Sequence, residues 1–186
     1  MKTYPDRNAM IRTLAPDSIV AEIGTQRGDF AAEILKTNPY RLYLIDVWRH
    51  QKGDYEADVA NVDDGGQEAN YRYVCERFAR EIETGQVVVM RMSSIEAASK
   101  IADDVMDAVY LDANHTKRAV SEDLRAWAPK VNGLGVIMGH DYTDRPEALK
   151  MKFGVIEAVT EFCEEGQWKL VGLTKDEWPS YELERV

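Results

Sequence analysis

Five short runs of apolar residues recur along the chain, each about as long as one β-strand. They lie at residues 18–23, 41–46, 86–91, 107–112 and 135–139. Most of these runs are continuously hydrophobic, whereas a strand with one face in water alternates apolar and polar residues. The pattern therefore predicts strands that are covered on both faces, as in a parallel sheet.

Helical spacing of apolar residues occurs between these runs. It predicts helices at residues 29–36, 67–83, 94–101 and 116–129. Asp29 is expected to cap the first of these helices, and Pro129 to end the last. Strands that alternate with helices imply right-handed crossovers between parallel strands. The sequence thus predicts an α/β protein with a Rossmann-like, doubly wound sheet.

The end of the chain departs from this alternation. A helix is expected at residues 154–165, and β-like runs at 168–173 and 180–186 follow it with no room for another helix. Neighbouring strands that are joined by a short connection pair antiparallel. We therefore expect a mostly parallel sheet with an antiparallel C-terminal hairpin at one edge, where a homodimer could also form.

Length and composition favour one globular domain that spans residues 1–186. The chain is 45% hydrophobic and 30% charged, as ordinary folded domains are. Its 33 acidic residues outnumber its 23 basic ones, which gives a formal net charge of −10. Binding to nucleic-acid phosphates needs clustered Lys and Arg, so this balance argues against a nucleic-acid partner, and equally against a membrane surface. No signal-type segment or membrane-spanning apolar run is present, which predicts a cytoplasmic protein.

Candidate chemistry lies where the first two strands end, because ligands of open α/β sheets bind there. Gly24 and Gly28 follow the first strand and permit a tight turn close to a ligand. Asp46 ends the second strand, where an acid can hold ribose hydroxyls. Glu22 disfavours a diphosphate but suits the ammonium of the methionyl part of S-adenosylmethionine. Since Gln26 also replaces the second glycine of a dinucleotide motif, S-adenosylmethionine is favoured over NAD.

A second group of polar residues follows the fourth and fifth strands. Asp112 and Asp141 are expected at the same sheet edge, with His140 beside them, in a set that suits Mg²⁺ or another divalent cation. A cation there lowers the pKa of a substrate hydroxyl, and His115 could accept its proton. The alternative is structural: Asp112 and Asn114 cap the helix that begins near Thr116, and His140 is a hydrogen-bonded structural residue.

Residues 50–66 form a long polar stretch that includes several aspartates and glycines. Such a segment is uncommon in a compact domain and is often a lid or a binding loop. We expect a lid over the cofactor, with Trp48 and Tyr55 as stacking groups. A solvated insertion is the alternative.

Two segments resemble a known family. Residues 20–30 (VAEIGTQRGDF) resemble the first motif of class I S-adenosylmethionine-dependent methyltransferases. Residues 107–115 (DAVYLDANH) and 139–142 (GHDY) resemble the bacterial branch that includes macrocin-type O-methyltransferases and cephalosporin hydroxylase-like proteins. The resemblance extends from about residue 19 to the final strand. It implies transfer of a methyl group to a small-molecule hydroxyl.

The resemblance also implies roles for individual residues. The implied cofactor-binding residues are Glu22, Gly24, Gly28, Asp46, Ser93 and Asp112. Asp112 and His115 would be catalytic, and Asp112, Asp141 and His140 would be the metal ligands. Imidazole binds Mg²⁺ weakly, so the ion could be softer or absent. The rival functions are a metal-free N- or O-methyltransferase, an inactive S-adenosylmethionine-binding protein and, more distantly, an NAD-dependent oxidoreductase.

Overall fold

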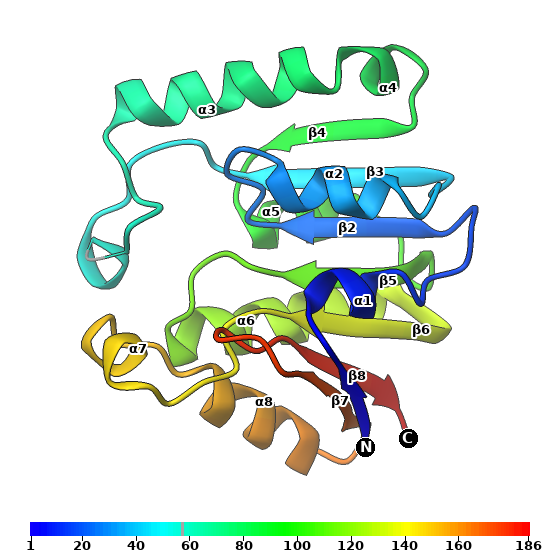
Figure 1. Ribbon diagram of the computed structural model, residues 1–186, viewed down its shortest axis with the longest axis vertical. Coiled ribbons are helices and arrows are strands. Elements are labelled where there is room, and N and C mark those ends of the chain that lie inside the picture. Colours follow the sequence, from blue (N-terminus) through cyan, green and yellow to red (C-terminus); the bar gives the residue numbers. More distant parts are fainter. Residues whose placement is uncertain (57) are drawn as a thin grey trace.

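The computed structural model describes residues 1–56 and 58–186. In this part of the chain, one eight-stranded sheet runs through the molecule in the order β1-β7-β8-β6-β5-β2-β3-β4 (Figure 1). Its strands are β1 Lys2–Tyr4, β2 Ile19–Ile23, β3 Arg41–Asp46, β4 Val87–Arg91, β5 Met106–Leu111, β6 Val131–Gly139, β7 Trp168–Thr174 and β8 Tyr181–Arg185.

Strand directions confirm the predicted doubly wound sheet. β2 pairs in parallel with both β3 and β5, and β5 pairs in parallel with β6. β8 lies antiparallel to β6 and to β7, as the short C-terminal connection predicted. The three-residue strand β1, which the pattern missed, covers the outer side of β7. β1, and not the C-terminal hairpin, is therefore the edge strand on this side of the sheet. The homodimer stays a prediction.

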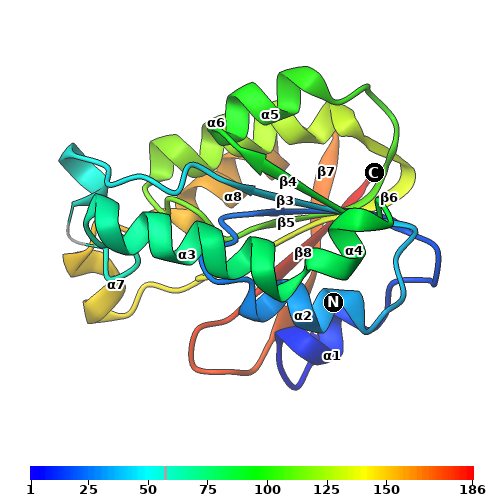
Figure 2. The same ribbon diagram turned by 90° about the horizontal axis from the view of Figure 1, so that it is seen from above.

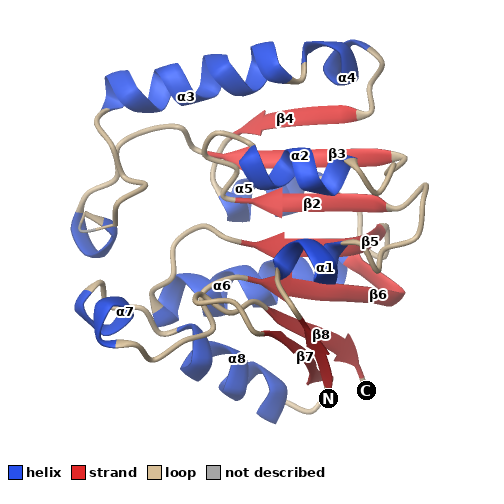
Figure 3. Cartoon of the chain, in the orientation of Figure 1, coloured by secondary structure: helices blue, strands red, loops and turns tan. Residues whose placement is uncertain are grey.

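Helices cover both faces of the sheet (Figures 2 and 3). One face carries α1 Arg7–Ile11, α2 Asp29–Leu35, α3 Asp64–Arg77 and α4 Ala79–Glu83, and the other carries α5 Ser94–Lys100, α6 Lys117–Trp127 and α8 Val155–Glu164. The remaining helical segments are η1 Gly53–Tyr55, η2 Ala128–Lys130 and α7 Pro146–Lys150. None of the helices in the described residues has the length and hydrophobicity to cross a membrane.

Two separate hydrophobic clusters explain why the strand runs are continuously apolar. On β2, Ala21 and Ile23 face the cluster beneath α5, α6 and α8, whereas Val20 faces the cluster beneath α1 and α2. Every position of such a strand is thus removed from water, so polar residues are costly in it. Glu22 is the exception, and it lies near the C-terminal end of the strand.

The predicted helix at residues 67–83 is wrong in its bounds. α3 starts three residues earlier because Asp63 caps it, with its Oδ1 accepting a hydrogen bond from the Gly66 amide at 2.7 Å. The backbone leaves the helical conformation at Phe78, and α4 begins after it. The polar stretch 50–66 is therefore partly helical, and its residue Ala57 lies outside the described residues.

Candidate active site

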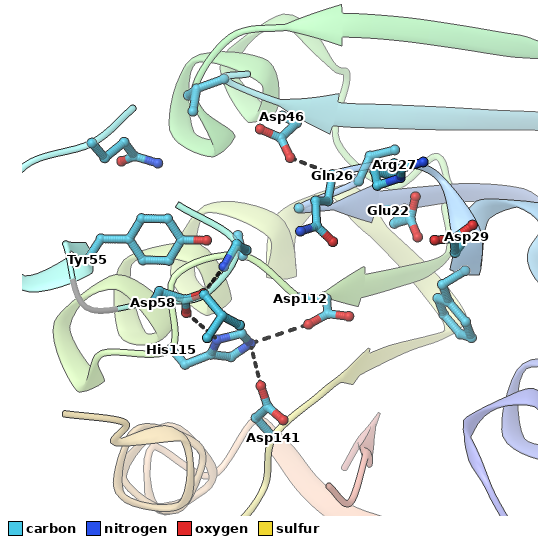
Figure 4. Close-up of a pocket in the computed structure, with 18 of the residues that line it drawn as sticks. Glu22, Gln26, Arg27, Asp29, Asp46, Tyr55, Asp58, Asp112, His115 and Asp141 are labelled. Atoms are coloured by element: carbon cyan, nitrogen blue, oxygen red, sulfur yellow. Dashed lines mark hydrogen bonds and ion pairs between the residues drawn. The ribbon is translucent and has the colours of Figure 1, made fainter. Parts of the chain in front are cut away.

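Two adjoining cavities lie at the C-terminal ends of the central strands. Their volumes are 330 Å³ and 520 Å³, which is the range of small-molecule sites. They share the lining residues Gly24, Asp46, Val47, Gln51, Tyr55 and Ala113. Figure 4 shows the first cavity, in which acidic side chains from several loops converge. β2 has β3 on one side and β5 on the other, so the site lies where ligands of doubly wound sheets bind.

The two glycines after β2 are required for different structural reasons. Gly24 has a φ of 93°, and a Cβ atom there would lie 2.0 Å from the carbonyl oxygen of Asp112. It lines both cavities, as expected of a cofactor-side residue. Gly28 has a φ of 71° and faces the ring of Phe78, which a Cβ would approach to 2.6 Å. Gly28 lines neither described cavity, so its expected place in the pocket is corrected: it caps α2, in place of Asp29.

Asp46 ends β3 with its carboxylate held by two backbone amides. Oδ1 accepts from the amide of Trp48 at 2.8 Å, and Oδ2 accepts from the amide of Gln26 at 2.9 Å. Burial raises the pKa of Asp46, although these hydrogen bonds favour its ionised form. Because Asp46 lines both cavities, it lies at the junction where a ligand that spans them would pass.

Glu22 is buried with one carboxylate oxygen unsatisfied. Its side chain lines the first cavity, yet only 2% of the residue is exposed and Oε2 has no hydrogen-bond partner in the described residues. Burial raises the pKa of Glu22 well above its ordinary value because the charged form loses its hydration. A buried polar atom without a partner calls for a ligand that supplies one, and a cationic donor fits best.

Asp112, His115 and Asp141 form the cluster that the strand ends predicted. Nε2 of His115 lies 3.4 Å from Oδ1 of Asp112 and 3.2 Å from Oδ2 of Asp141 (Figure 4). One potential ligand atom from each of the three lies within 4.8 Å of the others. The pairing of Leu111 with Gly139 brings the ends of β5 and β6 together and so sets this arrangement. Thr116 caps α6, so the helix-cap alternative is wrong for Asp112, whereas Asn114 accepts from the amide of Thr116 at 3.0 Å.

His115 carries a proton in this environment. Burial alone lowers its pKa, but interactions with Asp112, Asp58 and Asp141 outweigh this effect and raise the pKa to about 10. Asp58 comes from the segment that follows β3, and its Oδ2 lies 3.9 Å from Nδ1 of His115. Burial opposes ionisation of Asp112, yet His140, His115 and Arg7 lower its pKa. The imidazolium thus balances part of the negative charge of the cluster.

His140 lies beside the two proposed metal-binding carboxylates, and its role as a metal ligand stays a prediction. Its Nδ1 lies 3.0 Å from Oδ1 of Asp141 and 3.6 Å from Oδ1 of Asp112, so it contacts both carboxylates. It lines neither described cavity, and the group that could hold an ion contains His115 instead. The backbone of His140 is held directly after β6, where its amide donates to the carbonyl of Leu111.

Several residues of the site were not found from the sequence. Arg7 of α1 donates from Nη1 to Oδ2 of Asp112 at 3.1 Å and lines the first cavity. Phe153 packs beside His115 with ring centroids 4.6 Å apart, and Trp178 packs on Phe153. These residues come from the two ends of the chain, which carry none of the motifs.

Tyr55 and Ser93 lie at the cavities, whereas Trp48 is buried away from them. Trp48 is 1% exposed and donates from Nε1 to the carbonyl of Gln26, so the expectation that it stacks on a ligand is wrong. Tyr55 lines both cavities. Ser93 lines the second cavity and caps α5.

Comparisons with known proteins identify a matching family model and similar solved structures. A family model described as a methyltransferase domain matches residues 21–142. No curated protein matches the chain. A Streptococcus mutans protein assigned as a methyltransferase and solved in complex with SAH is similar, with 11% identity, a TM-score of 0.67, and 97% and 96% of the two chains covered. A Staphylococcus aureus protein assigned as a caffeoyl-CoA O-methyltransferase is also similar, with 13% identity, a TM-score of 0.63, and 94% and 78% of the two chains covered. A Clostridium thermocellum protein assigned as an rRNA-methylase has 12% identity and a TM-score of 0.66, with 97% and 95% of the two chains covered. At these identities the likeness shows the fold.

Proposed function

Since this chain belongs to the methyltransferase-domain family, we propose that it transfers a methyl group from S-adenosylmethionine to a hydroxyl group of a small molecule. The observation that carries the proposal is the convergence of Asp112, His115 and Asp141 on a cavity that Glu22 and Asp46 also line. Glu22 and Asp46 suit the methyl donor, and the three-residue cluster suits a hydroxyl nucleophile. The motif resemblance extends the proposal to the bacterial branch of macrocin-type enzymes.

The proposed donor would span the two cavities. Glu22, with its unsatisfied Oε2, would accept the ammonium of the methionyl tail, beside the backbone of Gly24. Asp46 would accept from the ribose hydroxyls at the junction, and Ser93 would lie beside the adenine in the second cavity. Asp112 borders the point between the tail and the acceptor. This assignment gives a use to the buried carboxylate, which no structural role requires.

Methyl transfer is an in-line displacement. The bond from sulfur to the methyl carbon breaks with its electron pair left on sulfur, a bond from the acceptor oxygen to that carbon forms, and the hydroxyl proton leaves. We propose that Nε2 of His115 takes this proton. It can do so only after losing the proton that the surrounding carboxylates now hold on it.

Asp112 and Asp141 are the residues that would hold a divalent cation, Mg²⁺ or a softer ion. Their oxygens are hard ligands, and the three-residue group is compact enough for one ion. A bound cation would lower the pKa of the acceptor hydroxyl and offset the negative field that keeps His115 protonated. Arg7 leaves Oδ1 of Asp112 facing His115, because it binds Oδ2.

The acceptor is proposed to be a small molecule. The first cavity has a volume of 330 Å³, and acidic residues outnumber basic ones in its lining: Glu22, Asp29, Asp46, Asp58, Asp112 and Asp141 against Arg7, Arg27, Arg49 and His115. Such a lining repels a phosphate backbone, and the chain carries a net charge of −10. Phe153 and Trp178 give the acceptor side an apolar wall.

Calorimetry with S-adenosylhomocysteine and NAD tests the proposed donor. The protein is expected to bind S-adenosylhomocysteine in the micromolar range and NAD not at all. Asp46→Ala should weaken S-adenosylhomocysteine by about 10- to 100-fold, since a hydrogen bond to a charged group contributes about 1.5–3 kcal/mol. Asp103→Ala, which removes a surface carboxylate paired with Lys130, is the matched control. Tight NAD binding without a response to S-adenosylhomocysteine would refute the proposal.

A further inference from the structure

A cationic side chain lies in the same cavity as the unsatisfied carboxylate of Glu22. Arg7 and Glu22 both line the first cavity. Burial raises the pKa of Glu22 well above its ordinary value, and the nearby charge of Arg7 opposes this rise. The cavity thus contains a guanidinium together with a buried carboxyl group whose Oε2 has no hydrogen-bond partner in the described residues.

We propose that Arg7 binds the carboxylate of the methionyl tail, while Glu22 binds its ammonium. This inference rests on the proposed donor, whose tail is an amino acid with both charges. The pair is complementary to that zwitterion. Arg27 and Arg49 also line the cavity, but Arg7 is the arginine that is ion-paired with Asp112 and whose charge acts on Glu22. Arg7 is therefore a cofactor-binding residue outside the motifs.

The guanidinium can serve two carboxylates at once. Its bond to Oδ2 of Asp112 at 3.1 Å uses Nη1, one nitrogen of a planar fork that has five N–H donors. The side chain remains 32% exposed, toward the cavity that it lines. Its cation also lies 4.6 Å from the centroid of the Phe30 ring, which supports the guanidinium from the α2 side. Arg7 is thus held in place before a ligand arrives.

The helix that carries Arg7 is fixed independently of this side chain. Asp6 caps α1 by accepting from the amide of Ala9 at 2.8 Å, and Asp176 accepts from the amide of Arg7 at 3.3 Å. Met10 and Ile11 are buried in the core. A substitution at Arg7 therefore removes the guanidinium and leaves the anchors of the helix intact. Arg7 also lies outside residues 21–142, the part that the family model matches. The proposed carboxylate-binding residue therefore comes from α1, and the proposed ammonium-binding residue, Glu22, from the matched part.

Two ligands that differ only in the carboxylate test the inference. Calorimetry should compare S-adenosylmethionine with its decarboxylated form, which keeps the ammonium and lacks the carboxylate. Arg7→Met is expected to weaken S-adenosylmethionine by about 10- to 100-fold and to leave the decarboxylated ligand nearly unchanged. Glu22→Gln should weaken both, because both carry the ammonium. Arg12→Met is the matched control, since Arg12 pairs with Glu33 at 3.5 Å on the surface and lines neither described cavity.

The outcomes separate this inference from the proposed function. If the unaltered protein binds S-adenosylmethionine but Arg7→Met weakens both ligands equally, or neither, the inference is overturned while the proposed donor stands. If the unaltered protein binds neither ligand, the proposed function fails and the inference fails with it. If Arg7→Met does not fold, Arg7→Lys tests the same point, because lysine keeps the positive charge and lacks the planar guanidinium. Arg7→Lys is expected to weaken binding of S-adenosylmethionine by less than Arg7→Met, and to leave binding of the decarboxylated ligand nearly unchanged.

Discussion

Replacing His115 with glutamine removes the imidazole that lies between the carboxylates of Asp112 and Asp141. In the native protein these carboxylates and Asp58 raise the pKa of His115 from 6.5 to about 10. A group with a raised native pKa stabilises the fold fully below its unfolded value, and that contribution is lost as the pH rises through the native value. The stabilisation from His115 is therefore present near neutral pH and disappears at alkaline pH.

The size of this effect follows from the pKa shift. The step from 6.5 to about 10 corresponds to roughly 3.5 pKa units, and each unit is worth about 1.36 kcal/mol, so the upper bound is about 5 kcal/mol. His115 is 8% exposed, so solvent screens these interactions little. His115→Gln should thus cost up to about 5 kcal/mol at about pH 6, and only the pH-independent packing part at about pH 10.5.

Urea unfolding of the two proteins, with a chelator present to exclude metal ions, measures the difference. Both should be unfolded at about pH 6, 8 and 10.5, and the free energies of unfolding compared at each pH. Groups that titrate alike in both proteins cancel in this comparison. A difference between the two proteins that stays constant over the whole range would refute the ion-paired state of His115.

Three further results are expected. Asp112→Asn and Asp141→Asn should each abolish Mn²⁺ binding with little change in S-adenosylhomocysteine affinity, and the double variant should lose no more; unchanged Mn²⁺ binding would contradict a shared ion. Amide hydrogen exchange at residues 50–63 should slow when S-adenosylhomocysteine binds, and unchanged exchange would leave the segment a surface insertion. Gly24→Ala should destabilise the fold by at least about 3 kcal/mol in urea unfolding, because its Cβ would lie 2.0 Å from a backbone oxygen. Gly85 also has a positive φ, of 77°, but faces open space, so Gly85→Ala should cost only about 1–2 kcal/mol.

Much of the sheet could be predicted from the sequence because burial leaves a local signal. A strand covered on both faces must be apolar along its length, and residues 18–23 and 107–112 show this plainly. β1, α1 and α7 have no such signal, since each is five residues or shorter and depends on partners far along the chain. The break between α3 and α4 was missed because Phe78 looks like one more apolar position, although its ring is required against Gly28.

The site was predictable where it follows from sheet geometry alone. Asp112 and Asp141 directly follow adjacent strands, so their convergence needs only the strand order. Arg7, Asp58 and Phe153 reach the site through tertiary packing that has no periodic signal. The place of His140 beside Asp141 was visible in the sequence, whereas the contacts of its side chain with both carboxylates depend on the strand geometry.

A crystal structure with S-adenosylhomocysteine and Mn²⁺ tests the proposed methyltransferase site most directly. The nucleoside is expected to span both cavities, with its ribose at Asp46, and an anomalous Mn²⁺ peak is expected between Asp112 and Asp141. A nucleoside bound elsewhere, or Mn²⁺ absent from this cluster at saturating concentration, would contradict the proposed arrangement.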